Sequence, residues 1–256
     1  MLEQSVEKIL SSLKESDLVL DIGGWAQPFN RANYVIDFMP YETRGLFGSR
    51  GGAREYFTKA TWIQRDICSR EPFPFRDKQF DFVICSHTLE DIRDPIWICS
   101  EINRIGKRGY IETPSRLTES SFGVESKKRS GYWHHRWLVE QQDKELIFSA
   151  KFQLMDQHWS YHFPASFYGK LPEEMKFMCF FWKDHFSFRE QVFPFQPDGV
   201  VKDYESFIRT HEGWPPYRYG LLHLRKHYRD SEFRKKMKPI LNLLEQPVKL
   251  LLKEVR

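Results

Sequence analysis

Three short apolar runs in the first third of the chain each end on an aspartate. They are LVLD, YVID and WIQRD, and they end at Asp21, Asp37 and Asp66. A fourth apolar run, FDFVICS, ends at Ser86. Short apolar runs are typical of parallel strands buried on both faces, and a parallel sheet presents its ligand at the carboxyl ends of its strands. The pattern therefore favours an α/β sheet that gathers carboxylates at its ligand-binding edge.

The elements expected up to residue 116 alternate between strands and connections. Apolar residues at helical spacing from Leu2 to Leu13 predict an amphipathic helix at the start. Asp94 and Pro95 predict the start of another helix, because aspartate caps free amides and proline fits the first turn; Gly106 predicts its end. Strands are expected at residues 18–20, 33–37, 62–65, 81–85 and 109–112. This alternation is typical of a parallel α/β sheet.

The connections among the first three strands are unusual. Residues 23–32 separate the first two strands, and Pro28 lies among them, so we expect a short irregular turn in place of a full crossover helix. Residues 41–58 contain four glycines and three arginines. We expect a mobile surface loop there, with one helical turn.

After residue 115 the pattern changes to short strands and helical stretches. The expected strands form two pairs, 137–139 with 146–152 and 177–182 with 186–192. A helical section is expected from Asp203. The second half therefore predicts a less regular portion made of β-hairpins and helices.

Charge and hydropathy exclude several kinds of partner. The formal net charge is +4, which does not indicate a nucleic acid partner, and no apolar run reaches the ~20 residues that span a bilayer. Residues 225–238 are basic but diluted by acidic side chains, so a solvated helix face is favoured. Residues 239–256 are apolar on one side; weak membrane-surface association is one interpretation, and covering an exposed face of the domain is the favoured one.

The cysteines and the first residues bear on location. No CxxC pair or zinc-ligand spacing occurs, so the thiols are expected to be reduced and mostly buried. The first sixteen residues carry acidic side chains and lack a signal-peptide apolar core, so secretion is not expected. These observations favour a cytoplasmic protein, and they leave its oligomeric state open. The cysteines are Cys68, Cys85, Cys99 and Cys179.

Residues 19–115 resemble the class I S-adenosylmethionine-dependent methyltransferases that act on small molecules. The most specific match is FPFRDKQFDFVICSHTLEDIRDP, from Phe73 to Pro95. RIGKRGYIETPS fits the fifth strand of that family, and VLDIGG fits its first motif. The resemblance implies a Rossmann-like, mostly parallel sheet with helices on both faces and S-adenosylmethionine as the cofactor.

The resemblance also implies cofactor-binding residues at the first two strand ends. Gly23 and Gly24 lack a Cβ and would let the backbone approach the ligand. Asp21 would meet the ammonium group of the ligand, directly or through water. Asp37 would accept the two ribose hydroxyls.

Further cofactor contacts are implied at the third and fourth strand ends. Asp66 and Ile67 would flank the adenine, and Ser86 and His87 would lie close to the methionine end. Each has a structural alternative, such as a core or helix-start role for His87.

Two acidic residues near these positions have ion-pair alternatives. Asp66 could instead pair with the neighbouring Arg65 on the surface. Glu90 is a weaker candidate for the site, and a salt bridge to Arg93 is the favoured interpretation.

The motif GYWHHRW follows the fifth strand and places two histidines side by side. His134 and His135 are candidates for a general base, with His87 as a further choice, since a histidine titrates near neutral pH. A metal site is an alternative, but adjacent residues of a strand point to opposite faces and would not easily ligate one ion. The third interpretation is structural, with the aromatic and histidine side chains packed beneath the sheet. His158 and His162 lie in the next segment.

We expect three segments with different roles. Residues 1–116 would form the cofactor-binding core, 117–200 the remaining strands and an acceptor-side insertion, and 201–256 a basic helical segment. The implied reaction moves a methyl group from S-adenosylmethionine to an oxygen or nitrogen of a small molecule, and a sugar-type acceptor is one open choice. No metal is required, because the sulfonium is already activated.

Two other classes of function stay open. The fold could bind a nucleoside ligand without catalysis and act as a partner-binding module. A nicotinamide-dependent oxidoreductase is disfavoured, because its pyrophosphate site needs GxGxxG leading directly into a helix, and GGWAQPF lacks that pattern.

Overall fold

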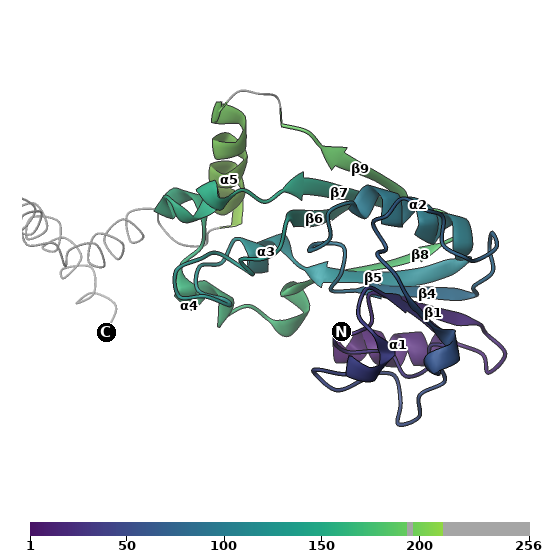
Figure 1. Ribbon diagram of the computed structural model, residues 1–256. Coiled ribbons are helices and arrows are strands. Elements are labelled where there is room, and N and C mark those ends of the chain that lie inside the picture. The colour runs from purple at the N-terminus through teal and green to yellow at the C-terminus, as the bar shows by residue number, and fades with distance from the viewer. Residues whose placement is uncertain (194–196, 212–256) are drawn as a thin grey trace, which may run out of the picture. The chain divides into compact units, whose positions relative to one another are not determined.

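The computed structural model describes residues 1–193 and 197–211, and a six-stranded sheet forms its centre (Figure 1). The strand order is β3-β2-β1-β4-β5-β8, and all neighbours are parallel except β8, which runs antiparallel to β5. The order reverses between β1 and β4, where a doubly wound sheet binds its ligand. The predicted mostly parallel α/β sheet is therefore confirmed. The strands are β1 (Val19–Ile22), β2 (Tyr34–Asp37), β3 (Trp62–Gln64), β4 (Phe82–Ser86), β5 (Arg108–Pro114) and β8 (Phe177–Lys183).

Helices pack on both faces of this sheet, as the resemblance implied. Helix α1 (Glu3–Ser12) contributes Val6 and Ile9 to the apolar cluster on one face. Helix α2 (Pro95–Ile105) contributes Ile98 and Ile102 to the cluster on the other, and the two helices lie on opposite sides of the strands (Figure 1). Successive strand residues point to opposite faces, so every strand supplies both clusters.

Helix α2 begins and ends where the sequence predicts. The Asp94 carboxylate accepts a hydrogen bond from the Trp97 amide at 3.0 Å, and Pro95 occupies the first turn. Gly106 follows the last helical residue. This helix holds one wall of the ligand-binding edge in place, because it starts directly after the turn that follows β4.

The connection from β1 to β2 is a loop without a helix, as expected. Residues 23–33 contain only bends, turns and an isolated bridge from Phe29 to Arg50. The connection from β2 to β3 is also irregular, with single 3-10 turns η1 (Tyr41–Thr43) and η2 (Lys59–Thr61). Both connections thus place loop backbone, rather than helix, over the carboxyl ends of the first strands.

A second sheet has the order β6-β7-β9, from β6 (Trp137–Gln142), β7 (Glu145–Ala150) and β9 (Ser187–Gln191). Strands β6 and β7 form the predicted hairpin. The predicted pairing of 177–182 with 186–192 is wrong, because β8 pairs with β5 and β9 pairs in parallel with β7.

The turn between β8 and β9 explains this difference. Asp184 adopts a left-handed backbone with φ of 65°, and Phe186 is buried. The side-chain amide of Asn103 on α2 donates to the Phe186 carbonyl at 2.8 Å and accepts from its N–H at 3.2 Å. These bonds direct the chain from one sheet to the other, so neither strand edge is left for a hairpin.

The remaining elements all follow β5 in the chain. Arg116 is buried and forms ion pairs with Glu140 of β6 and Asp203 of α5. The contacts among residues 1–208 join them into one compact unit. The elements outside the two sheets and the helices α1 and α2, apart from η1 and η2, are α3 (Arg116–Glu119), η3 (Gln153–Asp156), η4 (Trp159–Tyr161), α4 (Ala165–Tyr168), η5 (Glu173–Met175) and α5 (Pro197–His211).

Two expectations concern the end of the chain. The basic run at 225–238 and the apolar segment at 239–256 lie outside the described residues. In the part of the chain that the structure describes, no helix has the length and apolarity to cross a bilayer.

Candidate functional site

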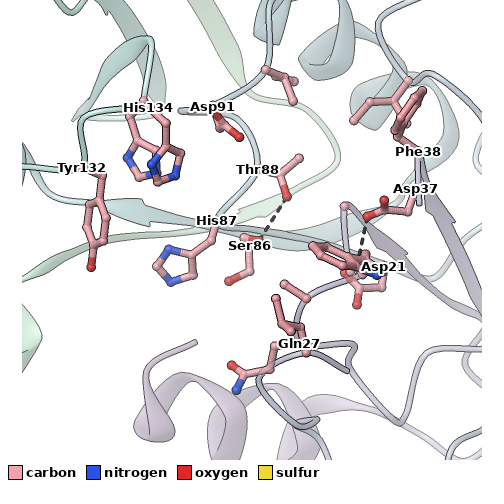
Figure 2. Close-up of a pocket in the computed structure, with 18 of the residues that line it drawn as sticks. Asp21, Gln27, Asp37, Phe38, Ser86, His87, Thr88, Asp91, Tyr132 and His134 are labelled. Atoms are coloured by element: carbon pink, nitrogen blue, oxygen red, sulfur yellow. Dashed lines mark hydrogen bonds between the residues drawn. The ribbon is translucent and has the colours of Figure 1, made fainter. Parts of the chain in front are cut away.

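A cavity of about 1010 Å³ opens at the carboxyl ends of β1, β2 and β4. Figure 2 shows Asp21 and Asp37 on one side of it, Tyr132 and His134 on the other, and His87 between them. The structure brings all ten site residues proposed from the sequence to this one cavity. They are Asp21, Gly23, Gly24, Asp37, Asp66, Ile67, Ser86, His87, His134 and His135.

Asp21 lies in β1, one residue before the end of the strand, and is buried, with only 3% of its surface exposed. Its Oδ2 accepts a hydrogen bond from the Phe29 amide at 2.9 Å, which fixes the loop after β1. Burial raises the pKa of this carboxyl to about 7; the Phe29 bond opposes the rise and the nearby Asp37 adds to it. Asp21 is thus an acid whose charge needs a ligand or water to stabilise it.

The two glycines after Asp21 make room for side chains of the site itself. A Cβ on Gly24 would lie 2.2 Å from Oδ2 of Asp21. A Cβ on Gly23, which has a φ of +75°, would lie 2.1 Å from Oγ1 of Thr88. The glycines therefore allow Asp21 and Thr88 to reach the cavity, a role that the motif alone did not reveal.

Asp37 ends β2 and meets the same loop. Its carboxylate accepts from the Met39 amide at 2.8 Å and from the Trp25 amide at 3.0 Å. Burial raises the pKa of Asp37 despite these bonds. In the described residues, no lysine or arginine pairs with Asp21 or Asp37. Two buried carboxylates without a lysine or arginine partner favour a ligand that brings hydroxyl or ammonium donors.

Asp66 follows β3 and pairs with Arg93, rather than with the neighbouring Arg65 considered from the sequence. Arg65 pairs with Glu71 at 3.1 Å instead. The Arg93 hydrogen bond lowers the pKa of Asp66, and the Cys68 amide donates to the same carboxylate at 2.9 Å. Ile67 is 7% exposed and supplies apolar cavity wall beside this pair.

His87 follows β4 in a left-handed backbone conformation, with a φ of 52°. Its Nε2 lies 3.0 Å from Glu112, and its Nδ1 lies 3.5 Å from Glu90. Burial alone would lower the pKa of His87, but hydrogen bonds and charge from Glu112 and Glu90 prevail and raise it to about 9. At neutral pH, His87 is therefore a fixed cation on the cavity wall and not a general base. The salt bridge expected between Glu90 and Arg93 is absent among the described residues, because Arg93 pairs with Asp66.

Glu112 was missed by the sequence analysis as a site residue. It is fully buried in β5, and its carboxylate meets His87, the Tyr110 hydroxyl and the Leu2 amide. Burial raises the pKa of Glu112, but the bond to His87 and other donors lower it to a net value well below normal. A carboxylate inside the apolar run GYIETP was the available signal, since an unpaired one would be costly there.

His134 and His135 lie in the turn before β6, so the strand geometry considered for them does not apply. Their ring centroids are 4.5 Å apart. Nδ1 of His135 lies 2.7 Å from Glu119, and Nδ1 of His134 lies 3.2 Å from Glu125. Each ring therefore has one nitrogen held by a carboxylate.

His158 and His162 take no part in this cavity. His158 lies at the start of η4 and bonds to Ser160, whereas His162 is buried and stacks on Phe122. Among the described residues, no group of three or more metal-ligating side chains is arranged to hold an ion.

Comparison with known proteins gives one sequence match and several structural ones. Residues 34–111 match a family described as a methyltransferase domain. No curated protein sequence matches the chain.

Three solved structures illustrate the structural likeness. The first is a Bacillus halodurans protein described as a methyltransferase, at 20% identity over 44% of this chain and 50% of that one, with a TM-score of 0.32. An S-adenosylmethionine-dependent methyltransferase from Aquifex aeolicus matches at 19% identity over 43% and 64%, with a TM-score of 0.29. A Haloferax volcanii complex of the Trm112 methyltransferase activator with a methyltransferase matches at 16% identity over 54% and 69%, with a TM-score of 0.34. The first match spans half of the other chain's length.

Proposed function

We propose that this chain is a class I, S-adenosylmethionine-dependent methyltransferase that transfers a methyl group from S-adenosylmethionine to an oxygen or nitrogen of a small molecule; the match of residues 34–111 to a methyltransferase-domain family supports this proposal. The observation that supports this most is the pair of buried carboxylates at the ends of β1 and β2, which pair with no lysine or arginine among the described residues. They lie at the point where the strand order reverses, within one large cavity.

The residues present fit this cofactor. S-adenosylmethionine carries an ammonium group, a sulfonium and two ribose hydroxyls, so Asp21 would face the ammonium and Asp37 the hydroxyls. A dinucleotide fits poorly, because a pyrophosphate would meet two carboxylates. The described loop at 23–33 also contains no helix whose amino end could hold a pyrophosphate.

The other cofactor contacts follow from their places on the wall. Asp66, fixed by Arg93, and the apolar Ile67 would flank the adenine. Ser86 and His87 would lie at the methionine end, where the imidazolium of His87 attracts the ligand's carboxylate. Glu112 would keep that imidazolium charged and in place.

When bound, the cofactor supplies an electrophilic methyl group that needs no metal to activate it. The chain's own task is to align a nucleophile with that methyl group and to exclude water from it. The acceptor end of the cavity is lined by Tyr132, His134 and His135, from which we propose the two histidines as candidates for a base. The aromatic side chain of Tyr132 suits a ring-bearing acceptor such as a sugar.

Calorimetric titration with S-adenosylmethionine and its demethylated product tests the cofactor site. We expect micromolar binding by the wild type and a tenfold to hundredfold loss in Asp37→Ala, since two hydrogen bonds to a carboxylate are removed. Asp77→Ala is the matched control, because Asp77 is a surface carboxylate that pairs with Arg104. Failure of the wild type to bind either compound would contradict the proposal.

A further inference from the structure

Glu119 forms the centre of a buried cluster at the acceptor end of the cavity. It is 1% exposed and belongs to α3, directly after the β5 segment. Its Oε1 lies 2.7 Å from Nδ1 of His135, and its Oε2 accepts from the ammonium of Lys151. The side chains of His135 and Lys151 are each 8% exposed, so both partners are also removed from water.

Lys151 is fixed in place by its remaining bonds. Its ammonium donates to the carbonyls of Ser130 at 3.0 Å and Tyr132 at 2.8 Å, which belong to the turn that carries His135. All three of its donors therefore have acceptors. The ammonium neutralises the Glu119 carboxylate and cannot move away without leaving several buried groups unpaired.

The charges of this cluster decide the protonation of His135. Burial raises the pKa of Glu119, but the bond to His135 and the charge of Lys151 prevail and keep it below normal, so Glu119 is ionised. The Glu119 and Lys151 charges cancel. A proton on each ring nitrogen of His135 would therefore add an uncompensated buried charge. The neighbouring Arg129 does not change this balance, because it pairs with Asp156 at 3.0 Å, and the His134 ring beside His135 has its own carboxylate partner in Glu125.

The ionised Glu119 accepts only, so Nδ1 of His135 must donate to it. Nε2 then carries the lone pair. In the described residues no hydrogen bond to Nε2 of His135 is found, and His135 lines the large cavity.

We propose that His135 is the base that accepts the proton of the acceptor, that Glu119 positions it, and that Lys151 keeps it neutral. This inference rests on the proposed function. For a hydroxyl acceptor, the O–H bond breaks and its proton moves to Nε2 of His135, while an O–CH3 bond forms, the CH3–S bond breaks and the sulfonium becomes a neutral thioether. The imidazolium that forms keeps its Nδ1–H bond to Glu119 and later releases its Nε2 proton to water.

The other two histidines of the cavity fit this role less well. His134 is 39% exposed, and its partner Glu125 is 33% exposed and 3.2 Å away, so solvent screens that pair. His87 lies between Glu112 and Glu90 as a cation and has no lone pair to offer at neutral pH. The geometry thus distinguishes His135 from the two histidines that the sequence could not separate from it.

The state of His135 is measured directly by long-range 1H–15N spectroscopy of the full-length, 15N-labelled protein at pH 7.5. The His135→Gln variant assigns its signals. We expect the neutral Nδ1–H tautomer in the wild type. In Glu119→Gln, Lys151 takes the amide oxygen and the amide NH2 faces Nδ1, so we expect the Nε2–H tautomer.

Variants of Lys151 provide a second test that does not remove Glu119. In Lys151→Met, the uncompensated carboxylate should hold His135 as an imidazolium at pH 7.5, with both nitrogens protonated. Lys151→Arg keeps the charge and should restore the wild-type tautomer. Glu125→Gln is the matched control, which should alter the signals of His134 and leave those of His135 unchanged.

The outcomes separate this inference from the proposed function. An imidazolium or Nε2–H tautomer in the wild type, or His135 signals that are the same in Lys151→Met and Lys151→Arg, would overturn the inference alone. If Glu119→Gln does not fold, the two Lys151 variants still decide. Calorimetry on the same samples measures binding of S-adenosylmethionine. Absence of binding to the wild type would overturn the proposed function, together with the role of His135 in it.

Discussion

Asp21 shows how burial of one side chain makes the molecule sensitive to pH. Its carboxyl has a pKa raised to about 7 by burial, against a normal value of 3.8 in an unfolded chain. Between these two pH values the folded protein holds a proton that the unfolded chain has released. Stability without cofactor therefore falls as pH rises from about 4 to about 7, by an amount on the order of 4 kcal/mol as an upper bound.

The Asp21→Asn variant should lose this pH dependence. Asparagine keeps an oxygen for the Phe29 amide but does not titrate, so the melting temperature of the variant relative to wild type should be higher at pH 8 than at pH 5. Thermal unfolding of the cofactor-free wild type and variant at both pH values measures this difference in melting temperature. Asp77→Asn changes an exposed position, so its melting temperature relative to wild type should be the same at pH 5 and at pH 8. An Asp21→Asn curve parallel to wild type would show that Asp21 is ionised in the folded protein.

Binding of the proposed cofactor should depend on the same proton. An ammonium group requires the ionised carboxylate of Asp21, so affinity for S-adenosylmethionine should weaken by up to tenfold per pH unit below about pH 7. Titrations at pH 5.5, 6.5 and 7.5 test this, and Asp21→Asn should bind weakly with a much flatter pH profile. Equal wild-type affinity at all three pH values would contradict the assignment of Asp21 to the ammonium group of the cofactor.

At the scale of elements, α2 organises both sheets. One of its faces packs on the central sheet, and Asn103 on the same helix holds the backbone of Phe186 between β8 and β9. The pairing of β9 with β7 therefore depends on a side chain that lies 83 residues away in the sequence. Pattern analysis of each strand contains no information about that contact.

Asn103→Ala should destabilise the protein by about 2 to 4 kcal/mol, because it leaves the buried N–H and C=O of Phe186 without partners. Urea unfolding measures the change in the free energy of unfolding. Gln141→Ala is the control, because it removes an exposed amide bond to Asp143 and should cost well under 1 kcal/mol. Equal effects of the two substitutions would show that the turn between β8 and β9 does not depend on Asn103.

At the scale of the whole molecule, the cofactor-binding core proposed for residues 1–116 draws on later parts of the chain. Strand β8 pairs with β5 along all seven residues, and its Phe180 and Trp182 are buried in the main apolar cluster. We keep the three segments as a proposed division of roles, with residues 117–200 supplying the acceptor side of the cavity through the turn at His134 and His135.

A chain ending at residue 116 should therefore fail to fold cooperatively. Without β8, the edge of β5 is unpaired and the apolar surface beneath Trp182 is exposed. A chain ending at residue 211 is the matched control, and we expect it to unfold cooperatively and to bind S-adenosylmethionine. Circular dichroism melts and calorimetry measure both properties. Cooperative unfolding of the shorter chain would show that its core is independent of β8.

The sequence alone determined the features that are local along the chain. Strand positions, the cap and end of α2, the missing crossover helix and the three acidic strand ends all depend on neighbours within a few residues. Because parallel strands end at one edge of a sheet, these local signals, together with the family resemblance, placed the eight proposed cofactor residues around one cavity.

The tertiary structure decided which partner each polar side chain meets. Glu112 on β5 contacts His87 at the end of the adjacent strand β4. Lys151 bonds to Glu119, which lies 32 residues away in the sequence. Asp66 pairs with Arg93 and not with its neighbour Arg65. The first two of these pairings set the charge of His87 and the proposed lone pair of His135. The bonds from Asn103 to Phe186 set the path of the chain between its two sheets. Burial and charge depend on the atoms that surround a group in space, and only the folded chain brings those atoms together.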